Sequence, residues 1–278
     1  MPVLTPFVKI SATRNHGAEV VLAGNTLAEA KEEADRLAEQ NNLVWVHPYD
    51  DAHVIHGQGT IGIEMLAQQP DLDVLVVPIG GGGLIAGIAT AAKALKPSAE
   101  VIGVETTLYP GMWGAFYGKD VRCEGATIAE GIAVRDIGVL TTEVVKRVVD
   151  DILLVSESSI ERAINAYLTL QRTIAEGAGA AGLAALLTEP ERFAGKRVGL
   201  VLCGGNIDPR LLSKIVVREL ARDGKLVSIR IDTPDRPGVL GEIATVIGDM
   251  QGNVVDVEHH RLFLNVPAKG ATLDVTFE

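Results

Sequence analysis

The chain has 278 residues, of which 47% are hydrophobic and 22% charged, and its formal net charge at pH 7 is −11. This composition is that of a globular protein with room for a large core and two domains, and the acidic balance argues against nucleic acid or an anionic membrane as a partner. Because no apolar stretch is long enough for a membrane span, no secretory signal is visible and only two cysteines are present, we expect a cytoplasmic protein without a disulfide framework.

The first 46 residues predict two helices, each followed by a strand. Residues 6–15 are expected to form a helix and residues 19–23 a short strand. The next helix begins at the capping box formed by Thr26 and Glu29, and the strand at residues 43–46 follows it. A strand, a helix and a second strand in this order predict parallel pairing.

A polar connection is expected over residues 47–60, before a helix at residues 61–67. It holds His47, His53 and His56, whose spacing could suggest metal ligands. No cysteine is near, and no H-x-x-x-H pair lies on a predicted helix, so we interpret them as loop histidines.

The strongest local signal lies in residues 73–87, where an apolar strand leads into four glycines and then into an alanine-rich helix. These glycines and the first leucine of the helix are Gly80, Gly81, Gly82, Gly83 and Leu84. Glycines at a strand-to-helix turn let successive backbone N–H groups point at one place, and the helix N-terminus adds partial positive charge. We therefore predict a phosphate site.

Two known phosphate loops do not match this stretch. It lacks both the G-x-G-x-x-G spacing of dinucleotide sites and the G-K-[ST] ending of nucleotide triphosphate loops, and the next basic residue is Lys93. The alternative is a tight turn that only lets the helix pack closely on the sheet. Four glycines in a row favour the phosphate.

Strands and helices continue to alternate up to about residue 223. The predicted elements are a strand at 101–105, an irregular stretch at 109–118, a helix at 140–149, a strand at 152–155, a helix capped by Ser156 or Ser158, a small-residue helix opening at 176–181 and a strand at 199–202. This alternation predicts an α/β fold with a doubly wound, mostly parallel sheet.

The pattern changes near residue 224. A strand at 226–231, a turn at 235–238, a helix at 239–250 and strands at 253–258 and 272–277 are expected there. This unit is short for independent folding, so we expect it to dock or to pair with a second copy.

Five motifs occur in order, and together they resemble those of the pyridoxal-phosphate-dependent threonine and serine dehydratases. They are Gly57-Gln58-Gly59-Thr60, Gly80-Gly81-Gly82-Gly83-Leu84, Thr127-Ile128-Ala129-Glu130-Gly131, Glu176-Gly177-Ala178-Gly179 and Cys203-Gly204-Gly205-Asn206. The segment around Asp235-Arg236-Pro237-Gly238 resembles an ACT domain, a small amino-acid-sensing module. The resemblance implies a fold type II catalytic domain at residues 1–223 and a ferredoxin-like ACT domain at residues 224–278.

The resemblance also assigns roles to site residues. Residues 80–84 would bind the cofactor phosphate, which agrees with the interpretation of the glycines. Gly131 would lie beside the cofactor ring, Glu176 would line the same pocket, and Cys203 would face the pyridine nitrogen. A neutral thiol there would leave the nitrogen largely unprotonated, which suits elimination of a β-hydroxyl group. The alternative for Cys203 is a small buried apolar residue.

The implied activity is that of a threonine ammonia-lyase, which converts L-threonine to 2-oxobutyrate and ammonia through a pyridoxal phosphate aldimine. The alternatives are a serine dehydratase or serine racemase, a non-catalytic amino-acid-sensing subunit, and a sugar-phosphate or nucleotide binder. A branched-chain amino acid is the expected effector, and a homo-oligomer the expected assembly. The effector would bind near Asp235, Pro237, Gly238 and Leu240.

Three departures from the family pattern stand out. The Schiff-base lysine motif and the Ser-x-Gly-Asn-His loop do not occur, so we expect an N-terminally truncated fragment that is inactive alone. Glu105 matches a cation ligand of some relatives, but Gly111 stands where an aspartate is needed, so no metal is expected. The ACT-like unit stops after its third strand.

Overall fold

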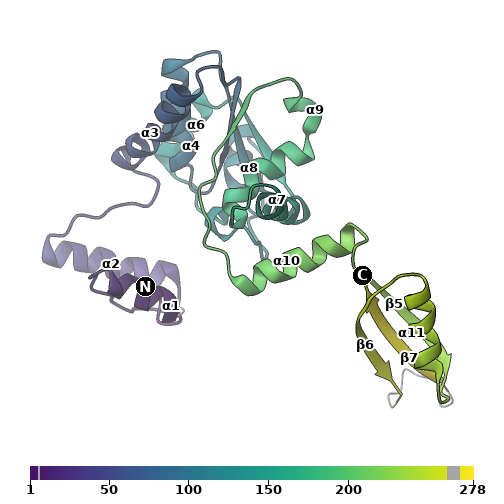
Figure 1. Ribbon diagram of the computed structural model, residues 1–278. Coiled ribbons are helices and arrows are strands. Elements are labelled where there is room, and N and C mark those ends of the chain that lie inside the picture. The colour runs from purple at the N-terminus through teal and green to yellow at the C-terminus, as the bar shows by residue number, and fades with distance from the viewer. Residues whose placement is uncertain (6, 262–269) are drawn as a thin grey trace.

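A computed structural model describes residues 1–5, 7–261 and 270–278 (Figure 1). The predicted N-terminal helices are α1 (Phe7–Asn15) and α2 (Leu27–Asn41); the expected start of α1 at Pro6 lies outside the described residues. The capping box is confirmed, because Thr26 Oγ1 accepts a hydrogen bond from Glu29 N at 3.2 Å.

The strands predicted at residues 19–23 and 43–46 are wrong, and so is the parallel unit built from them. Neither segment is paired in a strand ladder. Residues 19–23 instead meet the N-terminus, where Met1 N donates to Val21 O at 2.8 Å and Ala23 N donates to Met1 O at 2.9 Å. Because a strand needs a neighbouring strand for its backbone groups, apolar alternation alone did not create one here.

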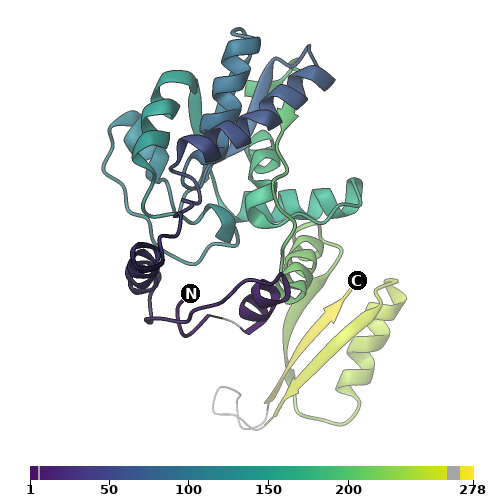
Figure 2. The ribbon, with the colours of Figure 1, turned by 90° about the vertical axis from the view of Figure 1, so that its left-hand side faces the viewer.

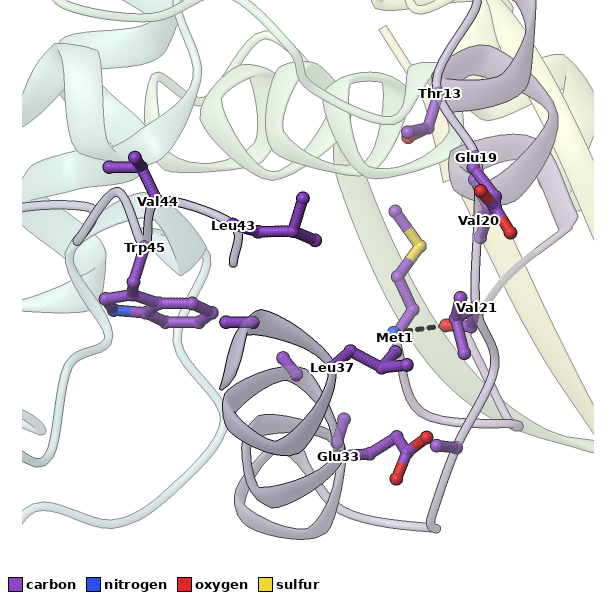
Figure 3. A pocket seen from close by; sticks show the side chains of 14 residues that line it. Met1, Thr13, Glu19, Val20, Val21, Glu33, Leu37, Leu43, Val44 and Trp45 are labelled. Carbon is purple, nitrogen blue, oxygen red and sulfur yellow. Dashed lines mark hydrogen bonds between the residues drawn. The ribbon is translucent and has the colours of Figure 1, made fainter. Parts of the chain in front are cut away.

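These N-terminal segments surround a hollow of about 300 Å³ with mostly apolar walls (Figure 3). Leu37 of α2 and Leu43, Val44 and Trp45 of the following segment line it together with Met1. Figures 1 and 2 show α1 and α2 apart from the central sheet, joined to it by an extended segment.

Helix α3 (Ala52–Gln68) begins nine residues before the predicted start at residue 61. Asp51 caps it, with Oδ1 accepting from His53 N at 2.7 Å and Val54 N at 3.3 Å. His53 and His56 are therefore helical, contrary to the loop interpretation, whereas His47 does lie outside a helix. A Cβ atom on Gly59 would stand 3.2 Å from Gly87 O, so a neighbouring segment approaches α3 closely there, whereas a Cβ atom on Gly57 would meet nothing within 4 Å.

Four parallel strands form the central sheet in the order β3-β2-β1-β4. They are β1 (Val74–Pro78), β2 (Glu100–Thr106), β3 (Asp151–Val155) and β4 (Val198–Leu200). Side chains of β1 and β2 are buried on both faces, as their continuous apolar runs predict.

Helices cover both faces of this sheet, which confirms the doubly wound α/β prediction (Figure 1). Helices α3, α4 (Gly83–Leu95), α5 (Gly111–Tyr117) and α6 (Val139–Val148) belong to one face. On the other face lie α7 (Glu157–Leu170), α8 (Gly177–Thr188) and α10 (Pro209–Arg222). Short α9 (Pro190–Phe193) and a 3-10 turn, η1 (Glu130–Ile132), complete this part.

Three details correct or refine the prediction. Residues 111–117, expected to be irregular, form α5, and α10 was not predicted. Ser156, rather than Ser158, caps α7: its Oγ accepts from Ser159 N at 3.2 Å.

The C-terminal segment forms a separate antiparallel sheet of order β5-β7-β6. Its elements are β5 (Val227–Pro234), α11 (Val239–Asp249), β6 (Val254–His260) and β7 (Gly270–Phe277). Leu273 and Val275 of β7 pack with Val239 and Ile247 of α11 in a core of their own. Figure 1 shows this unit beyond the end of α10. Among the helices that the structure describes, none combines the length and the hydrophobicity that a membrane span requires.

Candidate functional site

The four glycines lie at the carboxyl end of β1, in the centre of the parallel sheet. From β1 the chain proceeds to β2 on one side, and β4 later adds on the other side. The strand order therefore reverses between β1 and β4, which is where open α/β sheets form a crevice for ligands.

The backbone amides of residues 80–84 donate to no acceptor within the described part of the chain. The first α4 amide with a partner is Ala86 N, which donates to Gly82 O at 3.0 Å. Gly82 has φ of +96°, a conformation that only glycine adopts readily. Unpaired amides at a helix N-terminus have the chemistry of an anion site.

Tyr49, which the sequence analysis did not single out, lies directly against this loop. A Cβ atom on Gly81 would stand 2.2 Å from Tyr49 Cγ, so the ring occupies the space that a side chain would need. The Tyr49 hydroxyl donates to Asp136 O at 2.6 Å, and burial raises the pKa of this phenol. Its only sequence signal is an aromatic ring in an otherwise polar connection.

A cavity of about 690 Å³ opens at the glycine loop. All eight predicted cofactor-binding residues line it: Gly80, Gly81, Gly82, Gly83, Leu84, Gly131, Glu176 and Cys203. They come from four separate segments, and the structure thus brings the motifs to one place. Tyr49 and Gln58 line the same cavity and were not predicted. Among the described residues that line it, none is a lysine.

Glu176 and Gly131 form one wall. Glu176 precedes α8, and its Oε2 accepts from Asn206 N at 3.1 Å. A Cβ atom on Gly131 would stand 2.9 Å from Ala178 Cβ and 3.1 Å from Glu176 Oε1. A glycine at position 131 therefore lets η1 approach the start of α8.

Cys203 follows β4 and faces the cavity. Burial raises the pKa of its thiol, and the charge of Glu176 raises it further. The thiol is therefore neutral near pH 7, although the residue as a whole is exposed.

Glu105, the weak metal candidate, is 1% exposed at the end of β2. Its Oε1 accepts from Met112 N at 2.9 Å and its Oε2 from Trp113 N at 2.7 Å. Burial raises its pKa to about 7, against the effect of these two bonds. Both carboxylate oxygens thus hold the first turn of α5.

In the described residues, three metal-ligating side chains gather only on the C-terminal sheet: Glu258, His260 and Asp274. Both Asp274 oxygens, however, accept from the Arg230 guanidinium at 2.7 Å. A cation there would have to displace a bidentate ion pair.

The predicted effector residues lie in one turn before α11. Gly238 precedes the helix with φ of +92°, and Arg236 pairs with Glu242 at 2.9 and 2.8 Å. Asp235, Pro237 and Leu240 share this turn and the first residues of the helix. The structure places these four residues together, and their role stays a prediction.

A model of the pyridoxal-phosphate dependent enzymes matches residues 1–204. The chain belongs to this family. Pyridoxal phosphate is therefore its cofactor, and the fold type II prediction is confirmed. An ACT domain model matches residues 227–275, in agreement with the small antiparallel unit.

Three relatives of this pyridoxal-phosphate dependent enzyme are informative. An L-threonine ammonia-lyase of Thermotoga maritima is 43% identical over 280 residues, which cover 100% of this chain and 70% of the relative. The structure of threonine deaminase isoform 2 from Solanum lycopersicum has a TM-score of 0.73 at 37% identity, covering 81% of this chain and 62% of the relative. Maize serine racemase has a TM-score of 0.70 at 30% identity, covering 80% and 70%.

The cavity fits the phosphate of the cofactor. Unpaired amides, the start of α4 and glycines too crowded for a Cβ atom would accept a phosphate without any basic side chain. The cofactor ring, when bound, withdraws electrons from the substrate's α-carbon.

Proposed function

We propose that this chain forms the cofactor-binding part and the regulatory unit of a threonine ammonia-lyase, which converts L-threonine to 2-oxobutyrate and ammonia. The observation that carries the proposal is the convergence of residues 80–84, Gly131, Glu176 and Cys203 on one cavity at the strand-order reversal. The 43% identity to a named L-threonine ammonia-lyase over the whole chain supports the choice of reaction.

In this proposal each segment has a distinct task. The amides of residues 80–84 hold the phosphate, and Gly131 leaves room for the flat face of the ring. The neutral Cys203 thiol lies at the ring nitrogen and does not protonate it, which limits electron withdrawal to what a β-elimination needs. Glu176 holds the Cys203–Asn206 loop through the backbone of Asn206.

The turn at Asp235, Pro237, Gly238 and Leu240 would bind an amino-acid effector, with a branched-chain amino acid as the first candidate. An isolated unit of this size buries little apolar area, so we also propose that two copies pair in a homo-oligomer.

A serine dehydratase or serine racemase is the second candidate, supported by the structural likeness to maize serine racemase. Its lower identity, and the ACT domain that follows the catalytic unit here, favour the threonine enzyme.

A lyase assay on the protein purified from the organism that carries its gene tests the proposal. We expect the absorbance of bound cofactor and release of 2-oxobutyrate from L-threonine, faster than pyruvate from L-serine. Faster turnover of serine, or formation of D-serine, would favour the second candidate. A protein without cofactor absorbance that still binds isoleucine or valine would be a sensing subunit, and the lyase proposal would fail.

A further inference from the structure

Thr141 contacts the backbone of the glycine loop at the Gly81 carbonyl, although Thr141 does not itself line the cavity. It lies in the first turn of α6, is 0% exposed and is absent from the residues that line the cavity. Its Oγ1 donates to Gly81 O at 2.7 Å, and Gly138 N donates to the same carbonyl at 3.3 Å. The Gly81 carbonyl is therefore held by two donors from the start of α6.

Holding this carbonyl also fixes the next amide. The C=O of Gly81 and the N–H of Gly82 belong to one planar trans peptide, so they point in opposite directions. Because the carbonyl points at Thr141, the Gly82 N–H points to the side away from Thr141. Gly82 lines the cavity, and its amide has no acceptor within the described residues.

Thr141 is itself held in place by a distant segment. The two carboxylate oxygens of Asp50 accept from Val139 N and Thr141 N, each at 3.0 Å. A Cβ atom on Gly138 would stand 2.3 Å from Asp50 Oδ1 and 2.4 Å from Thr141 Oγ1. Because position 138 is a glycine, no side chain occupies the space in which the Thr141 hydroxyl donates to the Gly81 carbonyl.

We propose that Thr141 is a positioning residue for the phosphate site: its hydroxyl sets the Gly81–Gly82 peptide so that the Gly82 amide faces the phosphate. The inference rests on the proposed role of residues 80–84. It differs from that role because Thr141 does not line the cavity and acts through the backbone of the loop.

The test compares the affinities of the purified chain for pyridoxine 5′-phosphate and for pyridoxine, measured by equilibrium dialysis. Neither ligand has an aldehyde, so surface lysines cannot react with them. For Thr141→Val we expect roughly fivefold weaker binding of the phosphate ester and unchanged binding of pyridoxine, as for one lost hydrogen bond. The ³¹P resonance of the bound ester should also shift.

Two further variants separate positioning from general damage. Thr141→Ser keeps the hydroxyl and should restore the wild-type preference for the phosphate ester. Thr142→Val is the matched control, because the Thr142 hydroxyl donates to Gly138 O at 2.5 Å and not to the loop. Circular dichroism checks the fold, and Thr141→Ala replaces the valine variant if that one does not fold.

The outcomes distinguish the phosphate site at residues 80–84 from the positioning role of Thr141. A wild-type chain without preference for the phosphate ester would overturn the phosphate site together with the inference. A wild-type preference that Thr141→Val keeps in full would overturn only the role of Thr141. A loss that Thr142→Val shares to the same extent would also count against it.

Discussion

At the scale of single residues, Cys203 is the side chain whose charge decides the proposed chemistry. Its neutral thiol faces the cavity, and its pKa is raised by burial and by Glu176. We predict that bound pyridoxine 5′-phosphate keeps its absorption spectrum in Cys203→Ser and shifts to the protonated-ring spectrum in Cys203→Asp. A carboxylate beside the ring nitrogen would raise the pKa of that nitrogen.

The spectra are recorded at pH 8 with saturating ligand. Cys123→Asp is the control, because Cys123 lies near Gly111 and outside the cavity lining. Identical spectra for thiol, hydroxyl and carboxylate at position 203 would mean that this side chain does not face the ring.

Glu105 is the residue for which we predict a pH dependence of stability. Its pKa is about 7 in the folded protein, against an ordinary value of 4.5. Between these two pH values the folded state binds more protons than the unfolded state, so the free energy of unfolding falls as pH rises. The difference between these two pKa values means that the free energy of unfolding falls by about 3 kcal/mol between pH 4 and pH 8.

Urea unfolding at several pH values, monitored by tryptophan fluorescence, measures this dependence. Glu105→Gln has no ionisable group there, so the difference in stability between wild type and variant should change by about that amount over the same range. A difference that stays constant with pH would show that Glu105 titrates normally.

At the scale of helices and strands, the contact between α3 and α4 depends on glycine. A Cβ atom on Gly87 would stand 2.2 Å from Ile55 O and 2.6 Å from Gly59 N, both in the backbone of α3. We predict that Gly87→Ala lowers the free energy of unfolding by about 1–3 kcal/mol, because backbone atoms cannot move aside as a side chain can.

Gly57→Ala is the matched control on α3. A Cβ atom there meets nothing within 4 Å, so this variant should be as stable as wild type or gain up to about 1 kcal/mol from helix propensity. Thermal unfolding of both variants decides the matter: equal melting temperatures would contradict close packing at Gly87.

Buried elements could be predicted from the sequence, and exposed or unpaired ones could not. Strand β1 and helix α4 were predicted because β1 is apolar throughout and α4 is mostly apolar, and α2 because its capping box is local. The strand at 43–46 failed since Val44 is 88% exposed and has no partner strand. The start of α3 failed since Gly57 and Gly59 resemble loop residues, although Gly59 faces α4.

The same limit applies to the site. Its glycines and Cys203 belong to recognisable motifs, so their meeting at one cavity could be anticipated. Tyr49 and Thr141 act through spatial contacts with Gly81 that no short-range pattern encodes. Asp50 likewise caps a helix that begins 89 residues later.

At the scale of the whole molecule, α10 belongs to the α/β part and not to the ACT domain. Ile215 of α10 is buried in the core beneath the sheet, and Arg218 Nε pairs with Glu161 Oε2 of α7 at 3.1 Å. Arg222, in the last turn of α10, also forms an ion pair with Glu161. The chain then turns at Gly224, with φ of +68°, before β5.

We therefore predict that a chain ending at Asp223 keeps its affinity for pyridoxine 5′-phosphate and the thermal transition of the α/β part. The ACT domain has a core separate from that of the α/β part. Among the described residues, removal of this domain therefore uncovers no core residue of the parallel sheet. A chain ending at Ile207, which also removes α10 and the buried Ile215, serves as the comparison and should melt at a clearly lower temperature. Calorimetry and equilibrium dialysis on both chains measure this. If the chain ending at Asp223 loses as much stability as the chain ending at Ile207, the ACT domain supports the catalytic fold directly. The domain boundary would then not lie between Arg222 and Val227.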